Sequence, residues 1–211
     1  DTTAAPPAPG PVTDRFVLAT ANPHKAVEIA EVLAGLVELV PRPDDVADVE
    51  ETGETLVDNA RLKAVALVEA TGLPALADDT GLEVEALGGA PGVYSARFAG
   101  EDASYADNVT KLLTALDGEK GRAARFKTVA LARWPDGAEV VAEGVVNGTI
   151  TEAPRGNGGF GYDPVFVPDG GDGRTFAELA EESGHAKHRL SHRGRAFTEL
   201  ATLLRVRATE I

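Results

Sequence analysis

The sequence contains no cysteine, and this absence removes several kinds of chemistry. The chain can form no disulfide, carry no catalytic thiolate and offer no sulfur ligand to zinc. It also has no run of about 18 consecutive apolar residues, so no transmembrane helix and no membrane partner are predicted. The opening string DTTAAPPAPGP lacks the apolar segment of a secretory signal. We therefore expect residues 1–14 to be a disordered tail and the location to be cytoplasmic.

Basic residues are scarce as well. The chain has 20 lysines and arginines against 34 aspartates and glutamates, which gives a formal net charge of −14. Proteins that bind along nucleic acids need a basic face, because neutralisation of phosphates drives their affinity. No nucleic-acid partner is therefore expected. An acidic protein can still bind a small polyanion in a pocket where basic side chains or a divalent metal ion are gathered.

Alternating strand and helix patterns predict an α/β fold with a mixed sheet, formed by one domain over residues 15–211. Strands are expected at 16–20, at 74–79 with Asp78-Asp79 at its end, at 82–86 and at 162–167. A long β-hairpin is expected from 124–134 and 138–150. Helices are expected to begin at Asn22-Pro23, to run from Thr55 to Gly72, and to cover 104–117, 175–182 and 192–207.

The junction at Thr20, Asn22 and Lys25 is a candidate phosphate site. A helix N-terminus carries partial positive charge and unpaired N–H groups, so it binds anions. His24 and Lys25 lie in the first turn, where a cation is disfavoured unless an anion is bound nearby. Taken alone, the pattern is more typical of a solvated lysine, and it contains no GxxxxGK[ST] motif.

Lys63 lies seven residues after Leu56, in the same angular sector as the apolar stripe of the second predicted helix. A buried lysine needs an anionic partner, either a carboxylate of the protein or a phosphate of a substrate. The alternative is that its ammonium group extends along the surface into solvent.

Two acidic pairs are candidate metal ligands. Asp78 and Asp79 follow an apolar strand, and ligands of open α/β sheets gather beyond the carboxyl ends of strands. Magnesium prefers oxygen ligands, usually one or two carboxylates together with substrate phosphates. Glu50 and Glu51 form the second pair, although neighbouring carboxylates in an acidic chain are more often exposed to solvent.

The loop 156–164 places Phe160 and Tyr162 among four glycines. Glycine lets the backbone approach a ligand closely, and an aromatic ring offers a face on which a base can stack. Asp163 is suited to accept hydrogen bonds from a base or to orient its neighbours. A plain turn before a strand is the alternative.

Ser191, His192 and Arg193 open the last predicted helix. The planar guanidinium of Arg193 can donate to a carbonyl oxygen and a ring nitrogen of a base. A serine hydrolase is excluded, because adjacent serine and histidine side chains do not form a nucleophile–base pair easily and no G-x-S-x-G motif is present.

Together, five segments resemble the inosine triphosphate pyrophosphatase family, and they occur in the order found in that family over nearly the whole chain after the tail. They are TANPHK (20–25), EETGETLVDNARLKA (50–64), ADDTGLEVEALGGAPGVYSARFAG (77–100), GNGGFGYDPVF with 158–166 at its core, and SHRG (191–194).

The resemblance implies an elongated α/β fold of two lobes with a cleft between them, usually a homodimer. It implies magnesium-dependent hydrolysis of dITP, ITP or XTP to the monophosphate and pyrophosphate. Asp79 would activate water and bind Mg²⁺, with Asp78 beside it, Glu50 and Glu51 completing the metal site and Lys63 neutralising charge. The substrate-binding residues would be Thr20, Ala21, Asn22, Pro23, His24 and Lys25 at the phosphates, Thr80 beside Asp79, and Phe160, Gly161, Tyr162, Asp163, Lys187, His192 and Arg193 around the purine.

The chain departs from the family pattern in two places. Thr80 stands where the family more often has serine, which keeps the hydroxyl. The stretch from Glu182 to Ser191 carries extra residues before Lys187, although Lys187 keeps the family's spacing of four residues to Ser191. A 6-oxo purine is the expected base, because His192 and Arg193 can donate to an oxo group whereas an amino group would oppose donor to donor.

Two rival functions remain at the level of the sequence. One is a related pyrophosphatase for modified pyrimidine nucleotides or for a broad set of triphosphates. The other is a nucleotide sensor that binds without turnover.

Overall fold

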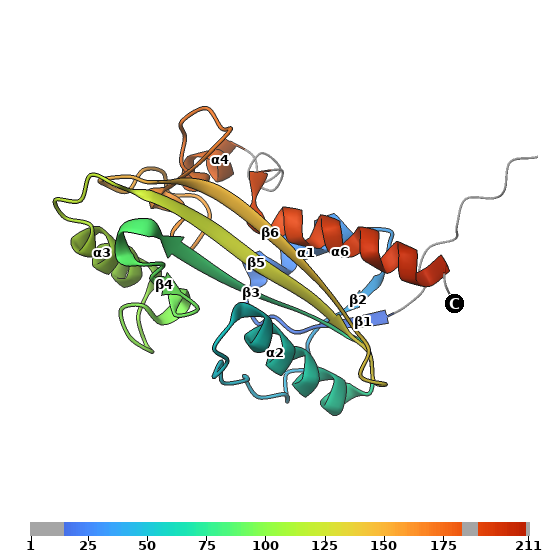
Figure 1. The fold of residues 1–211 in the computed structure, drawn as a ribbon. Helices are drawn as coiled ribbons and strands as arrows, with labels where there is room; N and C mark the ends of the chain where they lie inside the picture. Colours follow the sequence, from blue (N-terminus) through green and yellow to red (C-terminus); the bar gives the residue numbers. More distant parts are fainter. Residues whose placement is uncertain (1–14, 183–189, 210–211) are drawn as a thin grey trace, which may run out of the picture.

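A mixed, elongated seven-stranded sheet forms the spine of the protein (Figure 1). The computed structural model describes residues 15–182 and 190–209. The strands are β1 (Arg15–Leu18), β2 (Glu38–Val40), β3 (Ala75–Val84), β4 (Pro91–Gly92), β5 (Ala123–Arg133), β6 (Glu139–Ile150) and β7 (Phe166–Pro168). Their order is β2-β1-β3-β5-β6-β7, with β4 paired to β3. Only β1 makes parallel pairs, with β2 and β3, and β5–β6 is the predicted hairpin.

Helices divide the molecule into two lobes. The α-helices are α1 (Pro23–Leu33), α2 (Leu56–Thr71), α3 (Tyr105–Ala115), α4 (Phe176–Glu182) and α6 (His192–Thr209). In one lobe α1 and α6 cover one face of the sheet and α2 covers the opposite face, while α3 and α4 lie at the other end (Figure 1). The predicted two-lobed α/β architecture is confirmed. Among the helices of the described ranges, none combines the length and apolarity needed to cross a bilayer.

Local sequence signals set the helix ends as expected. The Asn22 side chain accepts hydrogen bonds from the backbone N–H groups of His24 and Lys25, and Pro23 occupies the first helical position of α1. The Thr55 hydroxyl accepts from the backbone N–H of Asp58, and α2 ends at a left-handed glycine.

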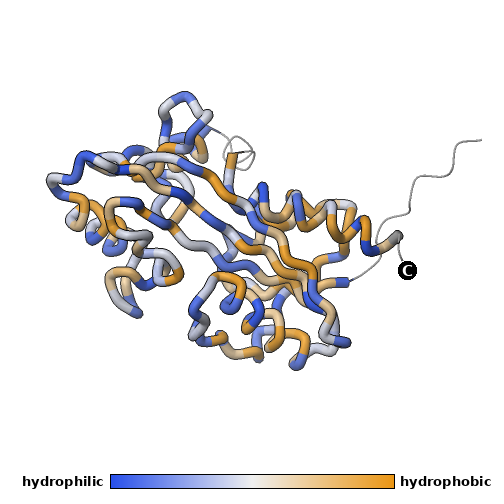
Figure 2. Tube along the Cα trace, viewed as in Figure 1, coloured by the Kyte–Doolittle hydropathy of each residue, from blue (hydrophilic) through white to orange (hydrophobic). Residues whose placement is uncertain are grey.

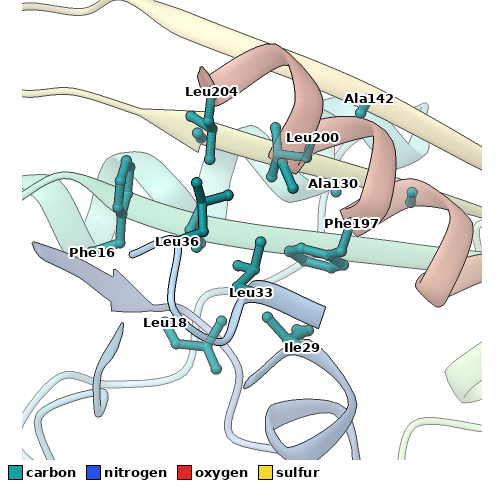
Figure 3. Close-up of a cluster of buried hydrophobic side chains, with 14 residues drawn as sticks. Phe16, Leu18, Ile29, Leu33, Leu36, Ala130, Ala142, Phe197, Leu200 and Leu204 are labelled. Atoms are coloured by element: carbon teal, nitrogen blue, oxygen red, sulfur yellow. The ribbon is translucent and has the colours of Figure 1, made fainter. Parts of the chain in front are cut away.

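Three apolar clusters form the core. The first lies between α1, α6 and the sheet, and Figure 3 shows Leu33 and Phe197 side by side within it. The second fills the lobe that carries α3 and α4 and is centred on phenylalanines, and the third lies under α2. Figure 2 shows hydrophobic positions concentrated where α1, α6 and the strands pack.

The prediction that a strand ends at Asp78-Asp79 is wrong. A single strand, β3, continues through both aspartates to Val84 and includes the start of the second strand expected at 82–86. Ten continuous pairs with β5 keep this segment extended. The strand expected at 162–167 is also shorter, because residues 163–165 form a 3₁₀ helix before β7.

The strand that does end beside these aspartates is β1. It pairs with β3 only at Ala75 and Leu76, and β4 pairs with β3 only at Leu82 and Glu83. Between these contacts, residues 77–81 have no strand partner on that edge within the described part of the chain. An opening between the lobes therefore lies along the middle of β3.

The first core cluster provides a test of the fold. We expect Phe197→Ala to lower the free energy of unfolding by about 3–5 kcal/mol, because the buried ring leaves a cavity. Val27→Ala, on the exposed side of α1, should change it by less than about 0.5 kcal/mol. Urea denaturation of both variants measures the difference, and equal effects would contradict this assignment of the core.

Candidate active site

A cavity of about 320 Å³ opens at the uncovered edge of β3, and residues of both lobes line it. Its volume lies at the lower end of the range typical of small-molecule sites. Most of the residues predicted from the sequence meet there. They are Thr20, Ala21, Asn22, Lys25, Glu51, Lys63, Asp78, Asp79, Thr80, Phe160, Gly161, Tyr162, Asp163, His192 and Arg193.

Three of the predicted residues that the structure describes lie outside the lining of the cavity. Pro23 starts α1 without lining the cavity, and the His24 ring stacks on Phe160 with ring centroids 5.3 Å apart. Glu50 is exposed to solvent outside the lining, so Glu51 is the member of the acidic pair that reaches the cavity. Lys187 lies outside the described residues.

The alternation of β3 sends its two aspartates to opposite faces of the sheet. Asp78 faces α1 and α6, where its Oδ2 lies 3.2 Å from Lys25 Nζ and 3.3 Å from Arg193 Nε. Asp79 faces α2, where its Oδ1 lies 3.6 Å from Lys63 Nζ. Because the edge between them is uncovered, both carboxylates border the same cavity.

Arg193 is held by buried acceptors. Its side chain is 2% exposed, and in addition to the Asp78 contact it donates from Nη1 to Glu28 Oε2 at 2.7 Å and from Nη2 to Thr80 Oγ1 at 3.2 Å. Glu28 was not predicted. The sequence feature that points to Glu28 is its position three residues after Lys25, which puts both side chains on one side of α1.

The cationic side chains of this cluster are not equally paired with carboxylates. Burial alone would raise the pKa of Asp78, but Lys25 and Arg193 hold that pKa well below its ordinary value. Burial also lowers the pKa of Lys25; Asp78 opposes this shift, while Arg193 and Lys63 add to it. Lys25 therefore shares one carboxylate with Arg193 and retains a need for a further anion.

Lys63 is partly buried between two carboxylates, so of the two alternatives the structure shows the lysine with an anionic partner. Its Nζ lies 2.8 Å from Glu51 Oε1 and 3.6 Å from Asp79 Oδ1. Burial would lower the pKa of Lys63, but Asp79, Asp78 and Glu51 raise it. The pKa of Asp79 is raised by burial and by the nearby Glu51, against the opposing effect of Lys63.

The oxygen atoms of Asp79 and Glu51 suit Mg²⁺. Both carboxylates contact the same lysine, and their mutual repulsion would be relieved by a cation between them. No three acidic or histidine side chains form a ready metal cage in the described ranges. This fits magnesium, which usually takes one or two protein carboxylates and completes its shell with substrate and water oxygens.

Asn59, which was not predicted, joins the Glu51 loop to Asp79. Its Nδ2 donates to Asp79 Oδ2 at 3.0 Å, and its Oδ1 accepts from the backbone N–H of Gly53 at 2.7 Å. A Cβ on Gly53 would lie 2.6 Å from that Oδ1, so only glycine permits this contact. The sequence signal was a polar residue in the apolar stripe of α2.

The end of the cavity away from the lysines and the aspartates of β3 is lined by aromatic side chains. Asp163 accepts from the backbone N–H of Phe160 at 2.8 Å, which supports its expected role in orienting neighbours. Tyr162 is buried and donates to the carbonyl oxygen of Ser95 at 2.8 Å, and its burial raises its pKa. Tyr105, another unpredicted residue, accepts from Asn22 Nδ2 at 3.2 Å and so links the two lobes.

His192 enters this end from the start of α6. Its ring stacks on Phe126 with centroids 4.5 Å apart, and its Nδ1 lies 2.6 Å from Thr128 Oγ1. A Cβ at Gly144 would lie 2.0 Å from the His192 carbonyl oxygen. The glycine in β6 thus allows α6 to rest directly on the sheet and carry its first residues to the cavity.

Comparison with known proteins identifies the family of the chain. The family model described as the Ham1 family matches residues 16–203. The chain belongs to the Ham1 family. The dITP/XTP pyrophosphatase of Streptomyces avermitilis is 47% identical over 198 residues, covering 90% of this chain and 97% of that protein. That of Thermus thermophilus is 50% identical over 191 residues, covering 88% and 89%.

Solved Ham1 structures share the fold. A HAM1 protein from Coxiella burnetii is similar with a TM-score of 0.83 and 41% identity, over 91% of this chain and 98% of that one. The Ham1 protein of Staphylococcus aureus gives a TM-score of 0.81 and 37% identity, over 92% and 100%.

The buried cluster of this Ham1 chain predicts a difference between two glutamate–arginine pairs. Glu28→Ala leaves the buried Arg193 short of an anion and should lower the free energy of unfolding by about 3 kcal/mol. Glu38→Ala breaks an exposed pair with Arg15 and should cost less than about 1 kcal/mol. Urea denaturation checks both values. A loss from Glu28→Ala no larger than that from Glu38→Ala would show that the cluster is not held as described.

Proposed function

We propose that this chain hydrolyses the non-standard purine triphosphates dITP, ITP and XTP to the monophosphate and pyrophosphate. One observation carries the proposal: Lys25, Lys63 and Arg193 meet Asp79 and Glu51 in one cavity whose other end is aromatic. Such a cavity offers cations and a metal site for a triphosphate and flat walls for a base. The relatives named dITP/XTP pyrophosphatase support dITP and XTP as substrates.

The phosphates bind beside Lys25 and Lys63. The N–H groups of His24 and Lys25 already donate to Asn22, so the lysine side chains supply most of the binding there. Lys25 is the stronger candidate for phosphate binding, because it shares the Asp78 carboxylate with Arg193. An added phosphate would balance the remaining positive charge.

Asp79 and Glu51 would hold magnesium, which would supply neutralisation of phosphate charge. Asp79 orients the attacking water and takes its proton. The water oxygen forms a bond to the α-phosphorus while the bond from that phosphorus to the bridging oxygen breaks, and pyrophosphate leaves. Asn59 and the backbone N–H of Thr80 hold the two oxygens of Asp79 in place.

The purine lies between the Phe160–Asp163 turn and the start of α6. Phe160 provides a stacking face, and His192 with Arg193 favours an oxo group at position 6. Lys187 is kept as a purine contact on the basis of the family pattern alone.

Assembly and location are also proposals. The family resemblance supports a homodimer in the cytoplasm, with magnesium as the cofactor. Sedimentation velocity at several concentrations would decide the oligomeric state, and a single monomer boundary throughout would refute the dimer.

A substrate panel tests the function. Pyrophosphate release from dITP, ITP, XTP, dATP and dTTP is measured with and without Mg²⁺, and the first three should be turned over faster. Asp79→Asn should lower turnover by about 100-fold or more, because the base is lost. Wild-type turnover by this variant would refute the assignment. Equal rates with dTTP would favour the rival pyrophosphatase, and tight dITP binding without turnover would favour a sensor.

The two glutamates of the acidic pair provide a separate prediction. Glu51→Gln should raise the Mg²⁺ concentration at half-maximal activity by roughly tenfold or more, because a charged ligand is lost. Glu50→Gln should change it little, since its side chain lies outside the cavity. Magnesium titrations at saturating dITP measure both. The opposite order would assign the metal to Glu50.

A further inference from the structure

A line of hydrogen bonds runs under the cavity from Arg193 to His192. Arg193 Nη2 donates to Thr80 Oγ1 at 3.2 Å, Thr80 Oγ1 lies 2.7 Å from Thr128 Oγ1, and Thr128 Oγ1 lies 2.6 Å from His192 Nδ1. Thr80 and Thr128 are directly opposite each other in the β3–β5 register. Thr128 is fully buried, so its hydroxyl has no access to water.

The end groups of this line allow one direction in which every bond is directed from Arg193 to His192. A guanidinium has only donors, so Thr80 Oγ1 accepts from Arg193. Within the described residues, Thr128 Oγ1 is the acceptor within reach of the Thr80 hydroxyl proton. When Thr80 donates to Thr128, the single proton of Thr128 is left for His192 Nδ1. In this direction each hydroxyl both accepts and donates, and the bonds strengthen one another.

We propose that Thr128 is a positioning residue that keeps the His192 proton on Nε2 and thereby makes the base end of the cavity select oxo over amino groups. Nδ1 is occupied as an acceptor, so the neutral ring can donate only from Nε2. The stack on Phe126 fixes the ring plane. The selectivity part rests on the proposed function, in which His192 faces the purine.

Selectivity arises because the neutral His192 ring is restricted to one of its two tautomers. A histidine that is free to exchange tautomers offers a donor to an oxo group and an acceptor to an amino group. A histidine locked by Thr128 offers only the donor, and an amino group then meets donor against donor. Thr128 touches no substrate, so it acts through His192 alone.

The first test needs no substrate. Long-range ¹H–¹⁵N correlation spectra of the nucleotide-free protein, at a pH where imidazole is neutral, report which ring nitrogen of His192 carries the proton. The signals are assigned by their loss in His192→Asn. Wild type and Thr128→Ser should show the proton on Nε2, whereas Thr128→Val should show tautomer exchange or a protonated Nδ1. A proton on Nδ1 in wild type, or an unchanged ring in Thr128→Val, would overturn the proposal.

The second test measures kcat/KM for dITP and dATP. Thr128→Val should reduce the preference for dITP by about tenfold, mainly through faster turnover of dATP, and Thr128→Ser should restore it. Thr175→Val is the matched control, because Thr175 is as buried as Thr128 but caps α4 outside the cavity. The preference of this variant for dITP over dATP should equal that of wild type.

The two tests separate the possible failures. A switched tautomer with an unchanged dITP preference in Thr128→Val would overturn the selectivity role. If neither wild type nor any variant hydrolyses dITP or dATP, the proposed function fails, while the result of the tautomer measurement still stands. A preference lost equally in Thr175→Val would assign the effect to general destabilisation and overturn the role of Thr128.

Discussion

The uncovered edge of β3 is the constraint on which the site depends. Adjacent residues of a strand point to opposite faces, so Asp78 and Asp79 could not share a pocket in the interior of a fully paired sheet. Because β1 stops pairing after Leu76 and β4 resumes only at Leu82, both faces open onto one space. Helices on the two faces then each bring a lysine to the same cavity.

Burying so many charges is costly unless they are paired, and the pairing here is specific to each face. On one side Asp78 and Glu28 offset Arg193 and Lys25, and on the other Asp79 and Glu51 surround Lys63. This arrangement gathers cations within a chain of net charge −14. The acidic surface repels large polyanions, whereas a small anion that enters the cavity meets lysines held by buried carboxylates.

Local signals in the sequence were sufficient for the helices and the hairpin, since Asn22-Pro23, Thr55 and Gly72 act on their own neighbours. They were insufficient for β3, whose length is set by pairing with β5, and for β2 and β4, which are too short to have a pattern. Glu28, Asn59 and Thr128 were missed because their partners are distant in the sequence; Glu28 contacts a residue 165 positions away. The division into a tail at 1–14 and one domain at 15–211 stays a prediction.

One guanidinium connects the two ends of the cavity. Arg193 donates to Asp78, which also pairs with Lys25, and to Thr80, which contacts His192 through Thr128. Any movement of the Asp78–Lys25 pair on phosphate binding would therefore shift the Arg193 guanidinium that donates to Thr80. That shift would change the strength of the hydrogen bonds from Thr80 through Thr128 to His192. It follows that an effect of substituting Arg193 cannot be attributed to the base contact alone. In the proposed function, recognition of the base and recognition of the triphosphate therefore both depend on this residue.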